Sequence, residues 1–93
     1  MTESIIYENP VFVKMEIFPR KAVIQRVKIV RENVAGKGRT KKKFAEQILG
    51  ISYTTYLEYE KNIVDLDFIY TLHHRFNYRL EWLLAGSGKP KND

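Results

Sequence analysis

Cysteine is absent from this 93-residue sequence, and so is any apolar run that approaches the about 20 residues of a membrane span. Without cysteine there are no disulfide bonds, thiolate zinc sites or cysteine nucleophiles. The first four residues lack the basic start and apolar stretch of a signal peptide. We therefore expect a protein of the cytoplasm with no membrane partner.

Positive charge is concentrated in the middle of the chain. The net charge of +5 divides into three parts: residues 1–18 hold three Glu against one Lys, residues 19–62 hold eleven Lys or Arg against four Glu, and residues 63–93 are balanced. A localised basic field indicates a polyanionic partner. The length allows one compact domain and is too short for two, and the hydrophobic content of 44% excludes a wholly disordered chain.

The first 18 residues differ in pattern from the rest. Alternate apolar positions over 11–18 would line one face of a strand, and residues 5–7 offer a second strand across the turn-prone Asn9-Pro10. The alternating residues are Val11, Val13, Met15 and Ile17. An isolated hairpin is marginal in water. This N-terminal strand or hairpin extension, residues 1–18, must therefore pack on the rest of the domain or on a second copy.

Helical periodicity begins after Pro19. Val23, Val27, Val30 and Val34 recur at helical spacing and predict an amphipathic helix over about 20–34. Hydroxyl or carboxyl side chains then stand where three further helices would begin. They are Thr40 before Lys41–Leu49, Ser52 before a helix from Tyr53 to about Lys61, and Asp65 before a helix from Leu66 to about Phe76.

The end of the chain predicts one more short helix. It runs through Leu80–Leu84 and stops at Gly86, and residues 87–93 have the composition of a flexible tail. The expected fold is thus mainly α, with a helical domain over 19–86.

Two of these helices are joined by the short turn Gly50-Ile51-Ser52. Ala45 is small enough to let the helices approach, Gly50 accepts a left-handed conformation, and Ile51 plugs the space beneath the turn. Ser52 caps the second helix, so that its N-terminus points outward. This arrangement predicts a helix-turn-helix, whose second helix enters the major groove of DNA.

The chain here resembles the Cro/phage-repressor (XRE-type) helix-turn-helix family. The resemblance lies in FAEQILGISYTTYLEYE from Phe44 to Glu60, and in LEWLLAGSG from Leu80 to Gly88, and it covers about residues 20–88. It implies a five-helix, lambda-repressor-like bundle. One departure is that Ala45 and Gly50 are five apart, where family members usually show four. Either the helix is one residue longer, or Glu46 takes the place of the small residue.

The site residues follow from the resemblance and from charge. The family pattern implies that bases are read at four positions of the second helix, although Glu58 would be repelled by phosphates and has a nearby Lys as its other partner. These positions are Tyr53, Thr54, Thr55 and Glu58. The basic run beside the turn predicts phosphate contacts. The residues assigned to them are Lys37, Arg39, Lys41, Lys42, Lys43 and Ser52.

The function expected from this pattern is a transcriptional regulator that binds double-stranded DNA as a homodimer, most simply a repressor. The alternative is an antitoxin that binds a toxin partner, because antitoxins also use this fold. No catalytic set can be assembled, and no cofactor is implied. His73 and His74 are adjacent on a helix, about 100° apart, so they do not form a metal site.

Overall fold

The computed structural model describes residues 19–92, which are mainly helical, as the sequence predicts. The helices are α2 (Arg20–Ala35), η1 (Lys43–Leu49), α3 (Tyr53–Lys61), α4 (Leu66–Phe76) and α5 (Leu80–Ala85). Within 19–92 the only β pairing is a single bridge between Tyr78 and Lys91. The strand or hairpin predicted over 1–18 lies outside the described residues.

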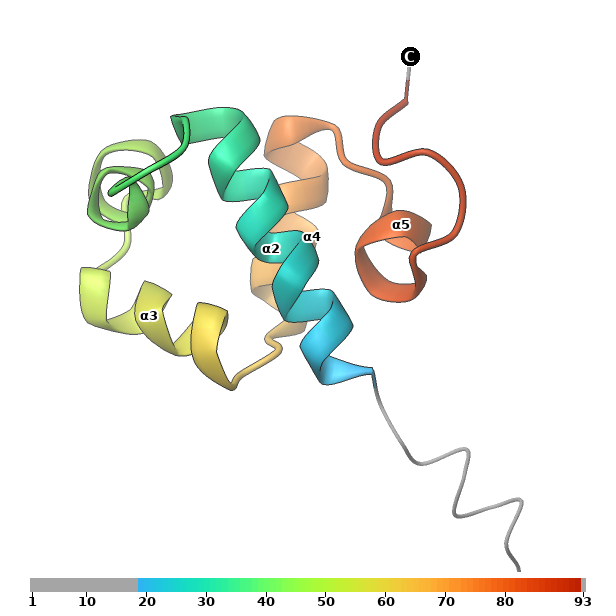
Figure 1. Ribbon diagram of the computed structural model, residues 1–93, viewed down its shortest axis with the longest axis horizontal. Coiled ribbons are helices and arrows are strands. Elements are labelled where there is room, and N and C mark those ends of the chain that lie inside the picture. Colours follow the sequence, from blue (N-terminus) through green and yellow to red (C-terminus); the bar gives the residue numbers. More distant parts are fainter. Residues whose placement is uncertain (1–18, 93) are drawn as a thin grey trace, which may run out of the picture.

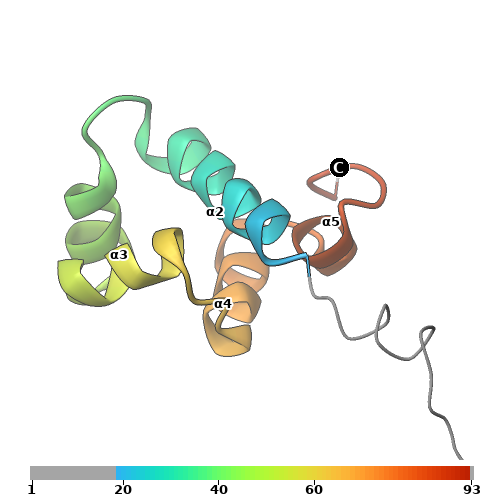
Figure 2. The same cartoon turned by 60° about the horizontal axis from the view of Figure 1, so that its bottom comes forward.

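Helix α2 runs through the middle of the domain. It crosses in front of α4, with η1 and α3 on one side and α5 with the C-terminal segment on the other (Figure 1). After a turn of the view, the loop that follows α2 is seen to arch over to η1 (Figure 2). The helices share one core of buried side chains, to which each contributes. Its largest fully buried members are Val23, Val27, Val30, Phe44, Tyr56, Ile69, Leu72, Tyr78 and Leu83.

Side-chain caps set two of the helix starts where the sequence predicts them. The Ser52 hydroxyl accepts a hydrogen bond from the Thr55 amide at 3.0 Å, and an Asp65 carboxylate oxygen accepts one from the Phe68 amide at 2.9 Å. Each such cap contributes about 1 kcal/mol. The observed bounds of α3 and α4 agree with the predicted ones, and α2 ends one residue beyond its predicted end at about residue 34.

Thr40 does not cap the next helix, contrary to the prediction. Its hydroxyl donates to the Gly36 carbonyl at 3.0 Å and accepts from Arg31 Nη1 at 2.9 Å. The side chain is turned back toward α2 because the Arg31 guanidinium and the end of α2 offer these partners. The helix still begins after Thr40, whose carbonyl accepts from the Phe44 amide at 2.8 Å.

The predicted flexible tail over 87–93 is instead folded onto the domain as far as the structure describes it. The Pro90 carbonyl accepts from the Arg79 amide at 2.8 Å, and the Asn92 carbonyl accepts from Asn77 Nδ2 at 3.2 Å. The Lys91 ammonium lies 4.9 Å from the centre of the Tyr78 ring. The break between α4 and α5 leaves backbone groups such as the Arg79 amide without helical partners, and the Pro90 carbonyl supplies one.

Candidate nucleic-acid interface

Helix η1 is π-helical, which explains the five-residue spacing between Ala45 and Gly50. The Ala45 carbonyl accepts from the Gly50 amide, five residues on, and from the Ile51 amide at 2.9 Å. A π-helical turn is wider than an α turn and holds one more residue. Ala45 therefore stays fully buried while Glu46 is exposed. Of the two alternatives that the sequence leaves open, the longer helix is the correct one.

The turn after η1 has the predicted geometry. Gly50 is left-handed, with φ 77° and ψ 30°, and Ile51 is half-buried beneath the turn. Arg75, near the end of α4, donates from Nη2 to the Ile48 carbonyl at 2.7 Å. A cation at the C-terminal end of a helix donates hydrogen bonds to the free carbonyls there and interacts favourably with the helix dipole. The turn is thus fixed from both sides, and no local sequence pattern predicts the Arg75 contact.

Helix α3 has an inner and an outer face. Tyr56 and Glu60 are buried on the inner face. Thr54, Thr55 and Glu58, three of the four predicted base-reading residues, are exposed together on the outer face. The fourth, Tyr53, is half-buried and lies apart from them, because successive residues of a helix point about 100° apart.

Ser52 and Thr55 are both exposed, and their hydroxyl groups are hydrogen-bonded to each other. The Ser52 hydroxyl donates to Thr55 Oγ1 at 2.8 Å while accepting from the Thr55 amide. The Thr55 hydroxyl is therefore part of the helix cap, although its own proton remains available to a partner. Thr54 takes no part in the cap, whose hydrogen bonds join Ser52 and Thr55. Of the two threonines, Thr54 is the one that can be changed without disturbing the start of α3.

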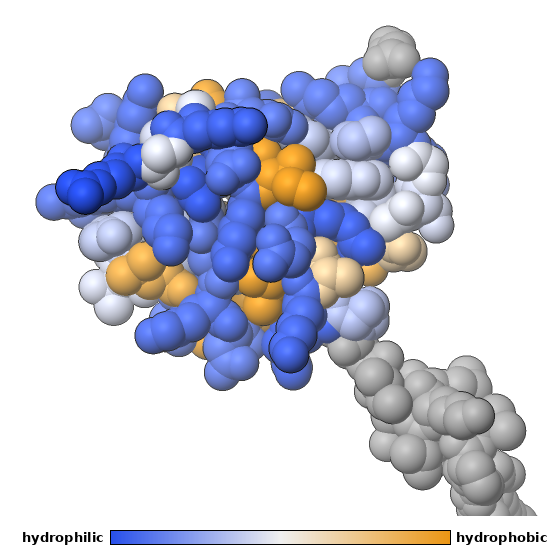
Figure 3. All heavy atoms as spheres, in the orientation of Figure 1, coloured by the Kyte–Doolittle hydropathy of each residue, from blue (hydrophilic) through white to orange (hydrophobic). Residues whose placement is uncertain are grey.

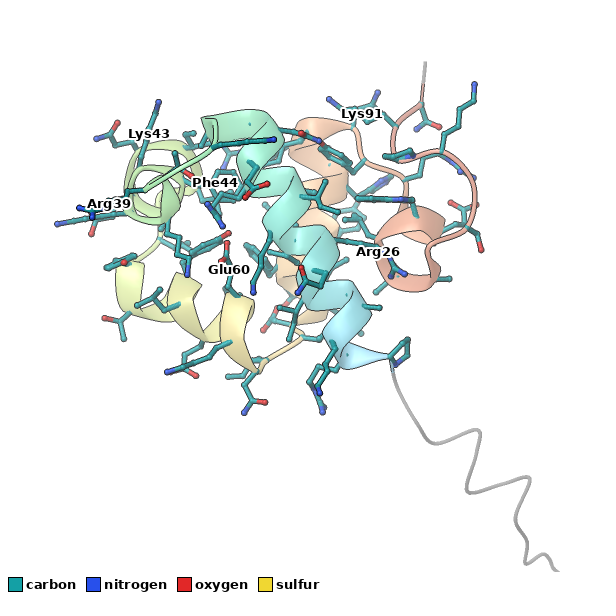
Figure 4. All side chains as sticks on the ribbon, viewed as in Figure 1. Arg26, Arg39, Lys43, Phe44, Glu60 and Lys91 are labelled. Atoms are coloured by element: carbon teal, nitrogen blue, oxygen red, sulfur yellow. The ribbon has the colours of Figure 1, made fainter. Side chains whose placement is uncertain are left out.

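The predicted phosphate contacts divide into two groups. Lys37, Arg39, Lys42 and Lys43 are exposed. Figure 4 shows Arg39 and Lys43 on the outer side of η1, away from α2, while Phe44 points inward. The surface over this part of the molecule is predominantly hydrophilic in Figure 3. Lys41 differs from the others, because its Nζ lies 3.6 Å from the buried Glu60 Oε1.

Arg39, Lys41 and Lys42 meet Tyr53 around a hollow. Together with Gly38 they line a space of about 320 Å³ between the loop before η1 and the start of α3. Residues from the segment before η1 and from the start of α3 thus come together at one place on the surface. The sequence predicted the cations as a run and did not predict that Tyr53 faces them.

A buried ionic cluster ties α3 to α2, and the sequence reasoning missed it. Glu60 Oε2 accepts from Arg31 Nε at 2.6 Å and from the Tyr56 hydroxyl. Figure 4 shows Glu60 directed from α3 toward α2. Arg31 follows Val27 by four residues and precedes Val34 by three, so it lies within the apolar stripe of α2. An arginine within an apolar stripe is the one sequence feature that could have indicated this buried ion pair.

The buried cluster raises the pKa values of Tyr56 and Arg31. Burial raises the pKa of Tyr56, and its hydrogen bond to Glu60 raises it further. Burial acts to lower the pKa of Arg31, but the hydrogen bond and charge of Glu60 outweigh it, so that the pKa of Arg31 is raised. Tyr56 therefore stays neutral and Arg31 stays charged throughout the physiological range.

His73 and His74 each contact another group of the protein. His73 Nδ1 is 2.7 Å from the Tyr78 carbonyl, and the His74 ring stacks on Tyr70. Over residues 19–92 no group of three His, Asp or Glu side chains is arranged to hold a metal ion. In the same range, each helix is too short or too polar to cross a membrane.

Comparison with known proteins adds no relative: no family model matches the chain, and neither a curated protein nor a solved structure is significantly similar to it.

Proposed function

We propose that this chain is a transcriptional regulator of phage or bacterial type, a repressor that binds double-stranded DNA sequence-specifically through a five-helix, lambda-repressor-like bundle. The observation that carries the proposal is the position of α3. Its inner face is buried through Tyr56 and Glu60, its outer face exposes Thr54 and Glu58, and its first residue, Tyr53, borders a hollow lined by cations. A helix held in this way can enter a groove about 12 Å wide without disturbing the core.

The side chains at the outer face support base reading. The Thr54 hydroxyl can bond a base edge and its methyl group can contact thymine, while the Glu58 carboxylate can accept from cytosine N4. Lys37, Lys42 and Lys43, exposed in the segment that precedes the turn, would supply the charge that fixes the position of the helix on the backbone. Base contacts and phosphate contacts are therefore offered by different residues, which allows them to be separated by experiment.

Selection of binding sites from random duplex DNA is the direct test. We expect the wild-type protein to enrich one sequence, and Thr54→Ala to change the preferred base at one position. A good base contact contributes about 1–3 kcal/mol of discrimination. Thr71→Ala on α4 is the matched control and should leave the preferred sequence unchanged, since its hydroxyl bonds the Asp67 carbonyl at 2.9 Å. A wild-type protein that binds no duplex at low salt would refute the proposal.

A second copy of the chain completes the proposal. One recognition helix covers few base pairs, and proteins of this kind bind two half-sites about 34–36 Å apart as a two-fold dimer. Leu66 and Tyr70 support this, because they share one face of α4 close to the end of α3 and are 66% and 56% exposed. The apolar residues predicted over 1–18 are the other candidate contact, and they lie outside the described residues.

Molar mass in solution tests the dimer. We expect the full chain to be dimeric at micromolar concentration, and Leu66→Glu to shift it toward monomer if the α4 face holds the two copies. Val13→Glu should have that effect instead if the N-terminal segment holds them. A wild-type chain that stays monomeric on its DNA site would contradict the dimer while leaving DNA binding intact.

A further inference from the structure

The hollow beside the start of α3 has the charge of an anion site. Arg39, Lys41 and Lys42 supply three cations to its lining, and among the described residues no acidic side chain lines it. By contrast, the hollow between α3 and α4 is lined by Asp65 and Asp67. Two openings of similar size in one small domain thus differ in the sign of their charge.

The cations of this hollow are not equivalent. Lys41 is held 3.6 Å from Glu60 Oε1, and its side chain is 43% exposed. Much of its charge therefore offsets that of a buried carboxylate. Arg39 and Lys42 are exposed on the rim. They are the cations that an incoming anion would meet, with Lys41 as a fixed charge behind them.

Tyr53 gives the hollow its other wall. It is the first residue of α3, is half-buried, and lines the same space as the three cations. Thr54 and Thr55 leave the helix in other directions and are exposed. The aromatic ring thus borders the cationic hollow, whereas the neighbouring threonines do not line it. A flat apolar ring beside a cationic hollow fits a group that is anionic at one end and apolar at the other.

We propose that the hollow holds one phosphodiester group of the DNA backbone, with Arg39 and Lys42 contacting the phosphate and the Tyr53 ring packed against the adjoining deoxyribose. Tyr53 is then a backbone contact, not a reader of bases as the sequence predicts. The inference rests on the proposed function. It assigns to Tyr53 a contribution to the affinity for every duplex and none to the choice among sequences.

The first test compares two duplexes, one selected for tight binding and one unrelated. We expect Tyr53→Ala to weaken binding to both by the same factor, and Tyr53→Phe to restore it because the ring is kept. Ile29→Ala, which truncates an exposed apolar side chain on α2 outside both the hollow and the candidate dimer face, is the control and should change neither. A Tyr53→Ala variant that alters the ratio of the two affinities, or that leaves both unchanged, overturns the inference.

The second test locates the phosphate. Uncharged methylphosphonates are placed one at a time along the selected duplex. We expect one position to weaken the wild-type protein but not the Arg39→Gln, Lys42→Gln double variant, whose slope of log affinity against log salt should fall by about two. If every position affects both proteins alike, the inference fails although DNA binding stands. If the wild-type protein binds neither duplex, the proposed function fails and the inference falls with it.

Discussion

The two sides of α2 are held by different kinds of contact. Toward η1 and α3, Arg31 meets the buried Glu60 carboxylate at 2.6 Å. Toward α5, Arg26 donates to the Leu83 carbonyl at 3.2 Å and Asn33 donates to the Tyr78 hydroxyl at 3.1 Å. The first side joins opposite charges inside the domain, while the second joins part-buried donors to neutral acceptors. The same helix therefore depends on charge balance along one side only.

This difference bears on the orientation of α3. A buried ion pair has a narrow range of good geometries, because its atoms cannot fall back on water when they move apart. The Glu60 carboxylate also accepts from the Tyr56 hydroxyl, within α3 itself. The helix proposed to read DNA is thus the one whose position is set by directional buried contacts.

The largest effect is expected from Glu60→Gln. It leaves the Arg31 guanidinium buried without a countercharge, and breaking such a pair costs about 3–5 kcal/mol. We expect the free energy of unfolding in urea to fall by that amount. Arg26→Gln, on the other side of α2, loses a part-buried bond to a carbonyl and should cost about 0.5–1.5 kcal/mol. Similar losses for the two variants would contradict the comparison.

A double substitution sharpens the same point. Replacing both charges, by Arg31→Met with Glu60→Leu, removes the unpaired charge and should recover much of the stability lost in Glu60→Gln. The double variant keeps the apolar volume between α2 and α3 but not the directional contacts. We expect it to fold and to bind DNA less selectively.

A smaller effect is expected at two of the left-handed helix ends, one on each side of α2. Gly50 has φ 77° and Asn77 has φ 63°. A side-chain Cβ at Gly50 would meet no atom within 4 Å, so Gly50→Ala costs only backbone strain, about 1–2 kcal/mol. Gly50→Asn should cost less, since asparagine tolerates this conformation, as it does at position 77. Equal melting temperatures for the Ala and Asn variants would refute this explanation.

The smallest effect concerns alkaline pH. Since the pKa of Tyr56 is raised in the folded protein, the unfolded chain loses this proton above about pH 10 while the folded protein retains it. The stability due to Tyr56 is therefore complete below pH 10 and declines above it. Tyr56→Phe should be less stable at pH 8 but should lose less on going to about pH 11. Parallel pH profiles of unfolding free energy would show that Tyr56 is not responsible.

The sequence predicted most of the helical framework because its helix ends are local. Ser52 and Asp65 bond amides three residues away, so their effect is visible in a short window of sequence. The winding of η1 and the fold of the C-terminal segment were not predicted. Both depend on partners brought close by the tertiary structure, such as the Pro90 carbonyl that accepts from the Arg79 amide.

The part of the candidate site that the sequence predicted likewise depends on local geometry, and the part that it did not predict depends on tertiary contacts. Exposure of Thr54, Thr55 and Glu58 followed from the position of the turn, and the structure agrees. The sequence predicts the same phosphate contact for Lys41 as for its neighbours, because a run of lysines gives no sign that one faces a buried carboxylate. That contact joins the start of the η1 segment to the end of α3, 19 positions apart in the sequence, at 3.6 Å.

Helix η1 also has a consequence for insertions and deletions. One residue added to an α-helix turns everything beyond it by about 100°, so that buried residues on one side of the insertion lose their facing partners. In η1 the widened turn absorbs the additional residue, and Phe44 and Ala45 before it and Ile51 after it all reach the interior. Loss of one residue between Glu46 and Ile48 would return the segment to ordinary winding. Length variation in this helix is therefore compatible with an unchanged core.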